Sequence, residues 1–171
     1  MPYAHEREGL WERLVSGRVT EVFVFGVADG STLGTYLPQT LGLEPIVCDA
    51  YKYTRSGELR SYDELVQVAQ QLAEGKRWVA EGGVPIWAAT FMDRAQAILF
   101  FDTFRSRLVR SDPRQRGKDD VLGAERFARE HFPEKLLAIT EPMQIQTLRR
   151  VRAVPAQQRA PGSTSAAEPG A

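Results

Sequence analysis

The sequence between positions 19 and 34 reads Val-Thr-Glu-Val-Phe-Val-Phe-Gly-Val-Ala-Asp-Gly-Ser-Thr-Leu-Gly. Its apolar run of β-branched and aromatic residues at 22–25 predicts a short strand that is buried on both faces. A glycine turn follows, and the segment from Ser31 to Leu41 predicts a helix. A strand, a glycine turn and a helix N-terminus together form an anion site, because free backbone N–H groups and the positive end of the helix dipole face the turn. We therefore expect a phosphate group here, bound by Gly26, Asp29, Gly30, Ser31 and Thr32.

The turn departs from the standard phosphate-binding loop. A P-loop has Gly, four residues, and then Gly-Lys-Ser or Gly-Lys-Thr, whereas the segment from Gly26 to Thr32 is shorter and has no lysine. No lysine or arginine occurs between Arg18 and Lys52. Asp29 adds a negative charge where a phosphate is expected. The role of the P-loop lysine is therefore vacant.

Two other interpretations of the turn remain open. A dinucleotide-binding turn would use Gly26, Gly30 and Gly34, with Asp49 as the acid that holds a ribose, although the glycine spacing differs from the usual fingerprint. Alternatively, the segment is an ordinary strand-to-helix turn of an α/β domain with no ligand.

The composition limits the classes of function. The chain has 171 residues, enough for one domain with a substantial core, and its 22 basic and 22 acidic residues cancel. Zero net charge gives no general attraction to nucleic acid or to anionic membranes, and no apolar run approaches the roughly 20 residues that span a bilayer. The single cysteine, Cys48, lies in an apolar run and is expected to be buried and reduced in a cytoplasmic protein. The N-terminus does not resemble a signal peptide.

Hydrophobic periodicity predicts alternating strands and helices along the chain. The expected strands lie at 20–25, 45–48, 77–80, 97–101 and 144–151, and the expected helices at 5–16, 31–41, 61–74, 86–94, 104–109 and 121–139, the last one kinked near Pro133. Ser61 and Glu64 have the spacing of a capping box. Residues 50–60 are expected to form an exposed polar loop, and residues 110–120 a charged, lid-like loop. The Pro-, Gly-, Ala- and Ser-rich tail at 153–171 is expected to be disordered, which leaves a single domain at 1–152.

This alternation predicts a three-layer α/β/α fold with a mostly parallel sheet of four or five strands. In such sheets, ligands bind outside the carboxyl ends of the strands. The predicted strands end at the Gly26 turn, Asp49, Glu81 and Asp102. Three carboxylates and one anion-binding turn are therefore expected to meet at one edge of the sheet.

In order and spacing, these segments resemble the P-loop nucleoside and nucleotide kinases, the group that includes adenylate kinases, uridine kinases and topology modulation proteins. Leu41-Gly42-Leu43 leading to Asp49 is similar to the family's link into its second strand and acid. The segments Lys76–Gly82 and Ala95–Asp102 resemble its next two strands. The arginines that fall where the family carries its lid are Arg105, Arg107, Arg110, Arg114 and Arg116. The resemblance covers residues 19–139 and implies a P-loop NTPase-like fold.

The resemblance also implies roles for these residues with ATP and Mg²⁺ as cofactors. Ser31 or Thr32 would be the hydroxyl ligand of Mg²⁺, and Glu81 or Asp102 would hold the metal through water. Asp49 would bind a substrate hydroxyl as the general base. Arg105 and Arg110 would assist catalysis, and Arg114 and Arg116 would contact the phosphates, because phosphoryl transfer requires neutralisation of charge on the moving group.

Each of these residues also has a purely structural interpretation. Asp102 would then only cap the helix that follows it, Glu81 would mark a close approach of two backbones, and the arginines would form a solvated face.

The expected partner is a nucleotide or another phosphorylated small molecule, with no role for nucleic acid or membrane. The leading hypothesis is transfer of a phosphoryl group from ATP to a nucleoside, a nucleotide or a small hydroxylated acceptor. A catalytically inactive pseudokinase used for binding or assembly is an equal alternative, and a dinucleotide-binding domain is a third.

Overall fold

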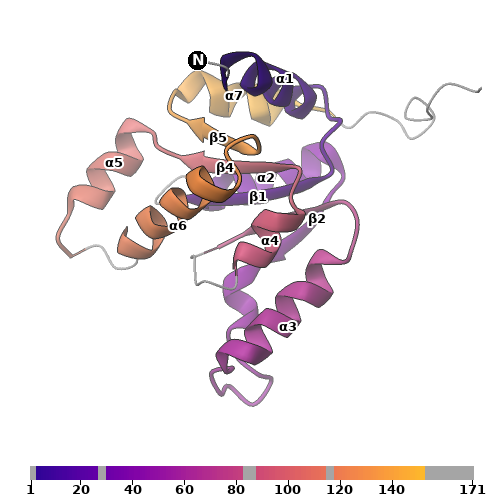
Figure 1. The fold of residues 1–171 in the computed structure, drawn as a ribbon, viewed down its shortest axis with the longest axis vertical. Helices are drawn as coiled ribbons and strands as arrows, with labels where there is room; N and C mark the ends of the chain where they lie inside the picture. The colour runs from indigo at the N-terminus through magenta and orange to yellow at the C-terminus, as the bar shows by residue number, and fades with distance from the viewer. Residues whose placement is uncertain (1–2, 27–29, 83–87, 115–117, 153–171) are drawn as a thin grey trace, which may run out of the picture.

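The protein is an α/β domain built on a five-stranded parallel sheet (Figure 1). The computed structural model describes residues 3–26, 30–82, 88–114 and 118–152. The strands are β1 (Glu21–Gly26), β2 (Glu44–Val47), β3 (Trp78–Glu81), β4 (Ala97–Phe101) and β5 (Leu136–Ile139). The helices are α1 (Tyr3–Val15), α2 (Gly30–Leu41), the short 3₁₀-helix η1 (Cys48–Tyr51), α3 (Tyr62–Ala73), α4 (Ala88–Arg94), α5 (Phe104–Ser111), α6 (Lys118–His131) and α7 (Pro142–Arg150).

The strands lie in the order β2-β3-β1-β4-β5, and every pairing is parallel. The central strand β1 is buried along its interior because its run of Val and Phe side chains contacts helices on both faces. β4, with the sequence Ala-Ile-Leu-Phe-Phe, is buried at every position. The predicted fold class, three layers around a parallel sheet, is confirmed.

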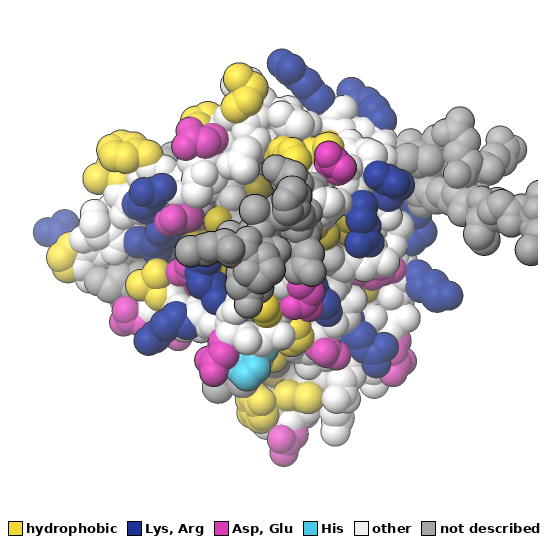
Figure 2. All heavy atoms as spheres, turned by 45° about the horizontal axis from the view of Figure 1, so that its top comes forward, with side chains coloured by type: hydrophobic (Ala, Val, Ile, Leu, Met, Phe, Trp, Pro, Cys, Tyr) yellow, Lys and Arg dark blue, Asp and Glu magenta, His cyan; other side chains and the backbone are white. Residues whose placement is uncertain are grey.

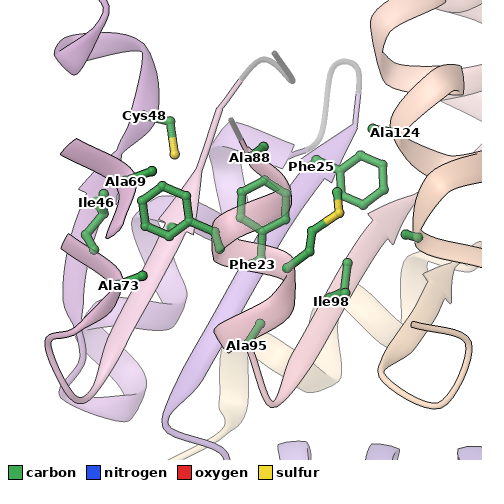
Figure 3. Packing of buried hydrophobic residues seen from close by; sticks show 14 of the residues in the cluster. Phe23, Phe25, Ile46, Cys48, Ala69, Ala73, Ala88, Ala95, Ile98 and Ala124 are labelled. Atoms are coloured by element: carbon green, nitrogen blue, oxygen red, sulfur yellow. The ribbon is translucent and has the colours of Figure 1, made fainter. Parts of the chain in front are cut away.

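Two hydrophobic clusters cover the two faces of the sheet. On one face, Phe23, Phe25 and Ile98 pack against α3, α4 and α6. Figure 3 shows Ile46 and Cys48 beside Ala69 and Ala73 of α3 in this cluster, and Phe25 at the side of Ala124 of α6. On the other face, Val22, Val24 and Leu99 pack against α1, α2 and α7. The helix that follows β1 therefore lies on the opposite face from the helices that follow β3 and β4.

The last third of the chain differs from the sequence-based expectation. The helix predicted for 121–139 ends at His131, because Pro133 cannot continue it, and the apolar run at 136–139 forms β5 instead. The strand predicted for 144–151 is wrong. This segment is the helix α7, which starts with Pro142 at its first turn and is capped by reciprocal hydrogen bonds between Glu141 and Gln144.

Other local predictions are confirmed. Ser61 and Glu64 form the expected capping box at the start of α3. Cys48 is a free, buried thiol.

The charged segment 110–120 is shorter than expected, because α5 continues to Ser111 and α6 already begins at Lys118. The tail at 153–171 lies outside the described residues. Among the helices that are described, none is long and apolar enough to cross a membrane.

Arg77 fixes the end of α2 against the start of β3. Its backbone has φ 67°, which is left-handed, and its guanidinium donates hydrogen bonds of 3.2 Å to the carbonyl oxygens of Leu41 and Gly42. These are carbonyls at the C-terminus of α2 that no helical N–H can reach. Arg77 therefore acts as a remote C-terminal cap of the helix whose other end begins at the candidate site.

We expect Arg77→Ala to lower the free energy of unfolding by about 1 kcal/mol, because the α2 carbonyls lose their donor. Arg77→Gly should cost less than Arg77→Ala, because glycine adopts the left-handed backbone without the penalty of about 1 kcal/mol that a Cβ incurs. Urea unfolding of the three proteins measures both differences. Equal stability of Arg77→Ala and the native protein would contradict the capping role.

Candidate functional site

The carboxyl ends of the strands bring the predicted site residues to one edge of the sheet. Gly26 ends β1, Asp49 follows β2 by two residues, Glu81 ends β3 and Asp102 follows β4 directly. Because all pairings are parallel, these four positions lie at the same edge, as expected. β3 lies between β2 and β1 in the sheet. Glu81 at the end of β3 therefore lies between Asp49, which follows β2, and Gly26, which ends β1.

Gly26 is required by close packing at the end of β1. It lies opposite Phe101 of β4 and has φ 148°. A Cβ at this position would lie 2.7 Å from the Cβ of Phe101, which is closer than any normal carbon contact. α2 begins at Gly30, so its N-terminal turn starts near the end of the central strand.

Several residues predicted for the phosphate turn fall outside the described part of the chain. Asp29 lies outside it altogether. Ser31 and Thr32 belong to the first turn of α2, but their side chains are not among those described. Their predicted contacts with phosphate and Mg²⁺ therefore stay predictions.

We expect Gly26→Ala to destabilise the protein by about 1–3 kcal/mol, because the new methyl group meets the Phe101 backbone and side chain. The matched control is Gly123→Ala in α6, where a Cβ meets no atom within 4 Å. That change should stabilise the protein by about 0.4–1 kcal/mol, because alanine reduces the entropy of the unfolded chain. Denaturant midpoints compare the two variants, and equal midpoints would contradict the packing argument.

The ends of β2 and β3 form a compact polar corner. Gly82 has φ 149°, and a Cβ there would lie 2.9 Å from the Cβ of Cys48 and 3.4 Å from the backbone N of Asp49. Gly82 therefore permits the close approach of the backbones that follow β2 and β3, as the sequence suggested. The exposed Asp49 carboxylate forms an ion pair of 2.6 Å with Lys52, one helical turn further on. The buried Oε2 atom of Glu81 has no hydrogen-bond partner among the described residues.

The electrostatics of this corner disfavour the charged forms of Glu81 and Cys48. Burial raises the pKa of Glu81, and the nearby Asp49 carboxylate raises it further. Burial, together with Asp49 and Glu81, raises the pKa of the Cys48 thiol to about 12, so this cysteine is not a nucleophile at neutral pH. An acid with an unpartnered, buried oxygen beside a second acid is a typical arrangement for binding a cation or a hydroxyl group.

Arg60 ends the loop that follows Asp49, directly before the capping box of α3, and has no role predicted from the sequence. Its backbone N donates to the Lys52 carbonyl oxygen at 2.9 Å, closing the short hairpin that includes the bridge between Tyr53 and Leu59. Its buried Nε atom has no hydrogen-bond partner among the described residues. Arg60 and Glu81 thus contribute the two unpartnered buried side-chain atoms found in the described chain. The sequence offers one signal for a role of Arg60, which is its position in the polar loop after β2, directly before the N-cap Ser61.

Asp102 does not cap α5. Thr103 is the N-cap, and its hydroxyl accepts a hydrogen bond from the backbone N of Ser106. The Asp102 carboxylate instead forms an ion pair with Arg110 and a looser one, of 3.5 Å, with Arg107. Arg110 is largely buried, also donates to the Phe101 carbonyl oxygen, and lies 5.5 Å from the ring centroid of Phe100. These contacts hold α5 against the end of β4.

The arginines predicted to form a lid differ in their positions relative to the end of β4. Arg110 and Arg107 lie near the end of β4, whereas Arg114 lies beyond the end of α5, where its backbone N donates to Asp112. Arg116 lies outside the described residues, and the side chain of Arg105 is not described. In the described part of the chain, no three His, Cys, Asp or Glu side chains gather as a metal site.

Comparison with known proteins gives a similarity in structure and none in sequence. No protein-family model and no curated protein sequence matches the chain. The chain is similar to the 1.7 Å crystal structure of a shikimate kinase from Bacteroides thetaiotaomicron, with 17% sequence identity and a TM-score of 0.49. The match covers 75% of this chain and 92% of that one. The assignment of a site therefore depends on the geometry of the chain itself.

Proposed function

We propose that this protein is a P-loop kinase-like enzyme that binds a nucleoside triphosphate at the carboxyl end of β1 and transfers its terminal phosphoryl group to a small hydroxylated acceptor. One observation carries the proposal. The chain leaves β1 towards one face of the sheet, and leaves both β3 and β4 towards the other face. Such a change of face creates the crevice in which α/β proteins bind their ligands. The N-terminus of α2 begins beside this crevice and favours a phosphate.

The acceptor would bind at the ends of β2 and β3. Asp49 is exposed there and would accept the proton of the attacking hydroxyl as general base. The Nε of Arg60, which has no partner in the described part of the chain, supports an acceptor, such as a nucleotide or a hydroxy acid, that also carries an anionic group. This position lies one strand away from β1, so acceptor and donor would meet over β3.

The residues at this edge fit Mg²⁺ only in part. The free Oε2 of Glu81 is the kind of oxygen that Mg²⁺ prefers, directly or through water. Asp102 fits less well, because Arg110 and Arg107 already engage its carboxylate. Glu81 would therefore hold the metal, together with a hydroxyl of the α2 N-terminus. A bound Mg²⁺ would neutralise charge on the phosphates.

A second candidate function is nucleotide-dependent binding or assembly without turnover. Two observations favour it: no lysine or arginine occurs between Arg18 and Lys52, and Asp102 neutralises Arg110, the best-placed arginine of α5. In contrast, the strand order does not favour a dinucleotide site. In the usual dinucleotide-binding order, 3-2-1-4-5-6, the second strand borders the first, whereas here β3 separates them.

The experiment that tests this function is a phosphoryl-transfer assay. The native protein is incubated with γ-labelled ATP, Mg²⁺ and a panel of nucleosides, nucleotides and small hydroxy acids, and labelled products are separated. We expect transfer to at least one acceptor, with a preference for acceptors that carry an acidic group. Binding of ATP without transfer to any acceptor would favour the non-catalytic alternative, and absence of both would overturn the proposal.

A further inference from the structure

The short hairpin between β2 and α3, at the bottom of Figure 1, exposes its apolar side chains and partly buries its cations. Its two sides meet at the bridge between Tyr53 and Leu59, and the backbone N of Arg60 donates to the Lys52 carbonyl oxygen. Side chains alternate between the two faces of such a ribbon, so Tyr53 and Leu59 share one face, and Lys52 and Arg60 share the other. Tyr53 is 55% exposed and Leu59 is 68% exposed, whereas both cations are partly buried. This arrangement is the reverse of the usual one, in which the apolar face of a ribbon is covered.

Lys52 and Arg60 lie directly opposite each other in the ribbon, one position beyond the bridge. Like charges at opposite positions destabilise a ribbon. The charge of Lys52 is compensated by Asp49, but Arg60 forms no ion pair within the described ranges, and its buried Nε donates no hydrogen bond there. The Glu64 carboxylate interacts electrostatically with Arg60, but its Oε2 accepts hydrogen bonds from Ser61. The cationic face of the hairpin therefore keeps a donor available for an anion.

Any attraction for an anion at this hairpin is local. The chain has no net charge. On the face of the molecule drawn in Figure 2, Lys and Arg side chains are spread among Asp and Glu side chains and form no continuous patch. An anionic ligand would therefore be held by particular charged donors at short range and not by the field of the whole surface.

We propose that Lys52 and Arg60 together bind the anionic group of the acceptor, and that Lys52 leaves Asp49 to do so. This inference rests on the proposed function, in which Asp49 is the general base. In the free protein the Lys52 ammonium lies 2.6 Å from Oδ1 of Asp49 and so occupies one oxygen of the base. The lysine side chain is 33% exposed and the aspartate side chain 52% exposed, and an ion pair with this exposure is weak enough to exchange partners.

This exchange makes Lys52 a specificity-determining residue. An anionic acceptor draws the ammonium towards Arg60, and the oxygen that it leaves can accept the proton of the acceptor hydroxyl. A neutral acceptor offers the ammonium no other partner, so Lys52 stays on Asp49. The free protein thus reserves its base for acceptors that carry an anionic group.

A phosphate titration followed by nuclear magnetic resonance tests the cation pair without turnover. The probe is inorganic phosphate, and the reporter is the Nε–H signal of Arg60, which is assigned by its loss in Arg60→Lys. This signal reports on its own surroundings, so phosphate bound at the turn after β1 is not mistaken for phosphate at the hairpin. We expect a saturable shift in the native protein, and roughly 10-fold weaker phosphate binding in Lys52→Met, because one charge-assisted hydrogen bond is lost. The matched control is Arg55→Met, which removes an exposed cation from the tip of the same hairpin and should bind phosphate like the native protein.

Asp49→Asn tests the exchange of partners. This variant should bind phosphate roughly two- to fivefold more tightly than the native protein, because Lys52 no longer has to leave an exposed ion pair. Most of this gain should disappear in the double variant D49N/K52M, compared with Lys52→Met. A gain of equal size with and without Lys52 would show only a general effect of the Asp49 charge and would overturn the exchange.

The phosphoryl-transfer assay gives a second measurement. Lys52→Met should lower kcat/KM for an anionic acceptor and raise it for a neutral acceptor of similar size, whereas a purely structural role would lower both. Circular dichroism confirms that each variant is folded. An Arg60 signal that phosphate does not shift, or a Lys52→Met protein that binds phosphate like the native one, would overturn this proposal and leave the proposed function standing. The expected phosphate binding in a protein without transfer activity would instead support the cation pair and count against the proposed function.

Discussion

Asp49→Asn is expected to reduce turnover by roughly 10²–10⁴-fold while nucleotide binding changes little. The substitution keeps the size of the side chain and its exposed position after β2, but it removes the carboxylate that would accept the proton of the acceptor hydroxyl. The ion pair with Lys52 is also lost, but it is exposed and therefore contributes little to stability. Turnover is measured by phosphoryl transfer, nucleotide binding by calorimetry, and folding by thermal melting.

The control for this variant is Asp93→Asn. Asp93 is exposed near the end of α4, at the amino edge of the sheet, and has no role in the proposed reaction. The Asp93→Asn variant should retain native turnover. A fall in melting temperature with unchanged turnover in Asp49→Asn would show that Asp49 is structural. Weaker NAD binding with no effect on ATP-dependent turnover would support the dinucleotide alternative.

Glu81→Gln is expected to lower turnover and yet raise stability at neutral pH. Turnover should fall by roughly 10–100-fold, the usual cost of losing a group that holds a metal through water. The melting temperature should rise by roughly 1–3 °C, because glutamine removes a partly desolvated charge that lies near Asp49. Solvent screening keeps this gain small, since the side chain is only half-buried.

The pH dependence of this gain has a defined sign. The folded protein raises the pKa of Glu81 above its ordinary value of 4.5, so the folded state binds the proton more tightly than the unfolded state. The contribution of Glu81 to stability is therefore complete below about pH 4.5 and is lost as pH rises through the folded-state pKa. The stability advantage of Glu81→Gln should appear above that window and vanish below it. Glu44→Gln, at the exposed opposite end of β2, should show no such pH-dependent gain.

The sequence predicts the parallel sheet, and the edge at which its acids gather, because apolar runs, glycines and acids carry local signals. The composition correctly locates the four strands that lead to Gly26, Asp49, Glu81 and Asp102. The composition does not locate β5 and α7 correctly. The segment Leu136–Ile139 suits a helix as well as a strand, and only the proline at 133 separates this segment from α6. Such short apolar segments depend on their neighbours in the fold for their conformation.

The positions of the candidate residues could be predicted from the sequence, but their contacts could not. The acids after parallel strands could be assigned to one edge, but not the ion pairs of Asp102 with the α5 arginines, since these depend on how α5 lies against β4. Arg60 was missed because a lone arginine in a polar loop resembles any solvated cation. Its buried, unpartnered Nε becomes visible only when the hairpin with Lys52 is formed.

Calorimetric titration of the native protein with ATP–Mg²⁺, and separately with NAD, tests whether the end of β1 binds a nucleoside triphosphate. We expect saturable binding of ATP–Mg²⁺ and no binding of NAD. The affinity should be roughly 10–100-fold weaker than that of a loop with its lysine, because one charge-assisted hydrogen bond to phosphate is missing. Binding of NAD without ATP, or no binding of ATP–Mg²⁺ at millimolar concentration, would contradict a nucleoside triphosphate site at the end of β1.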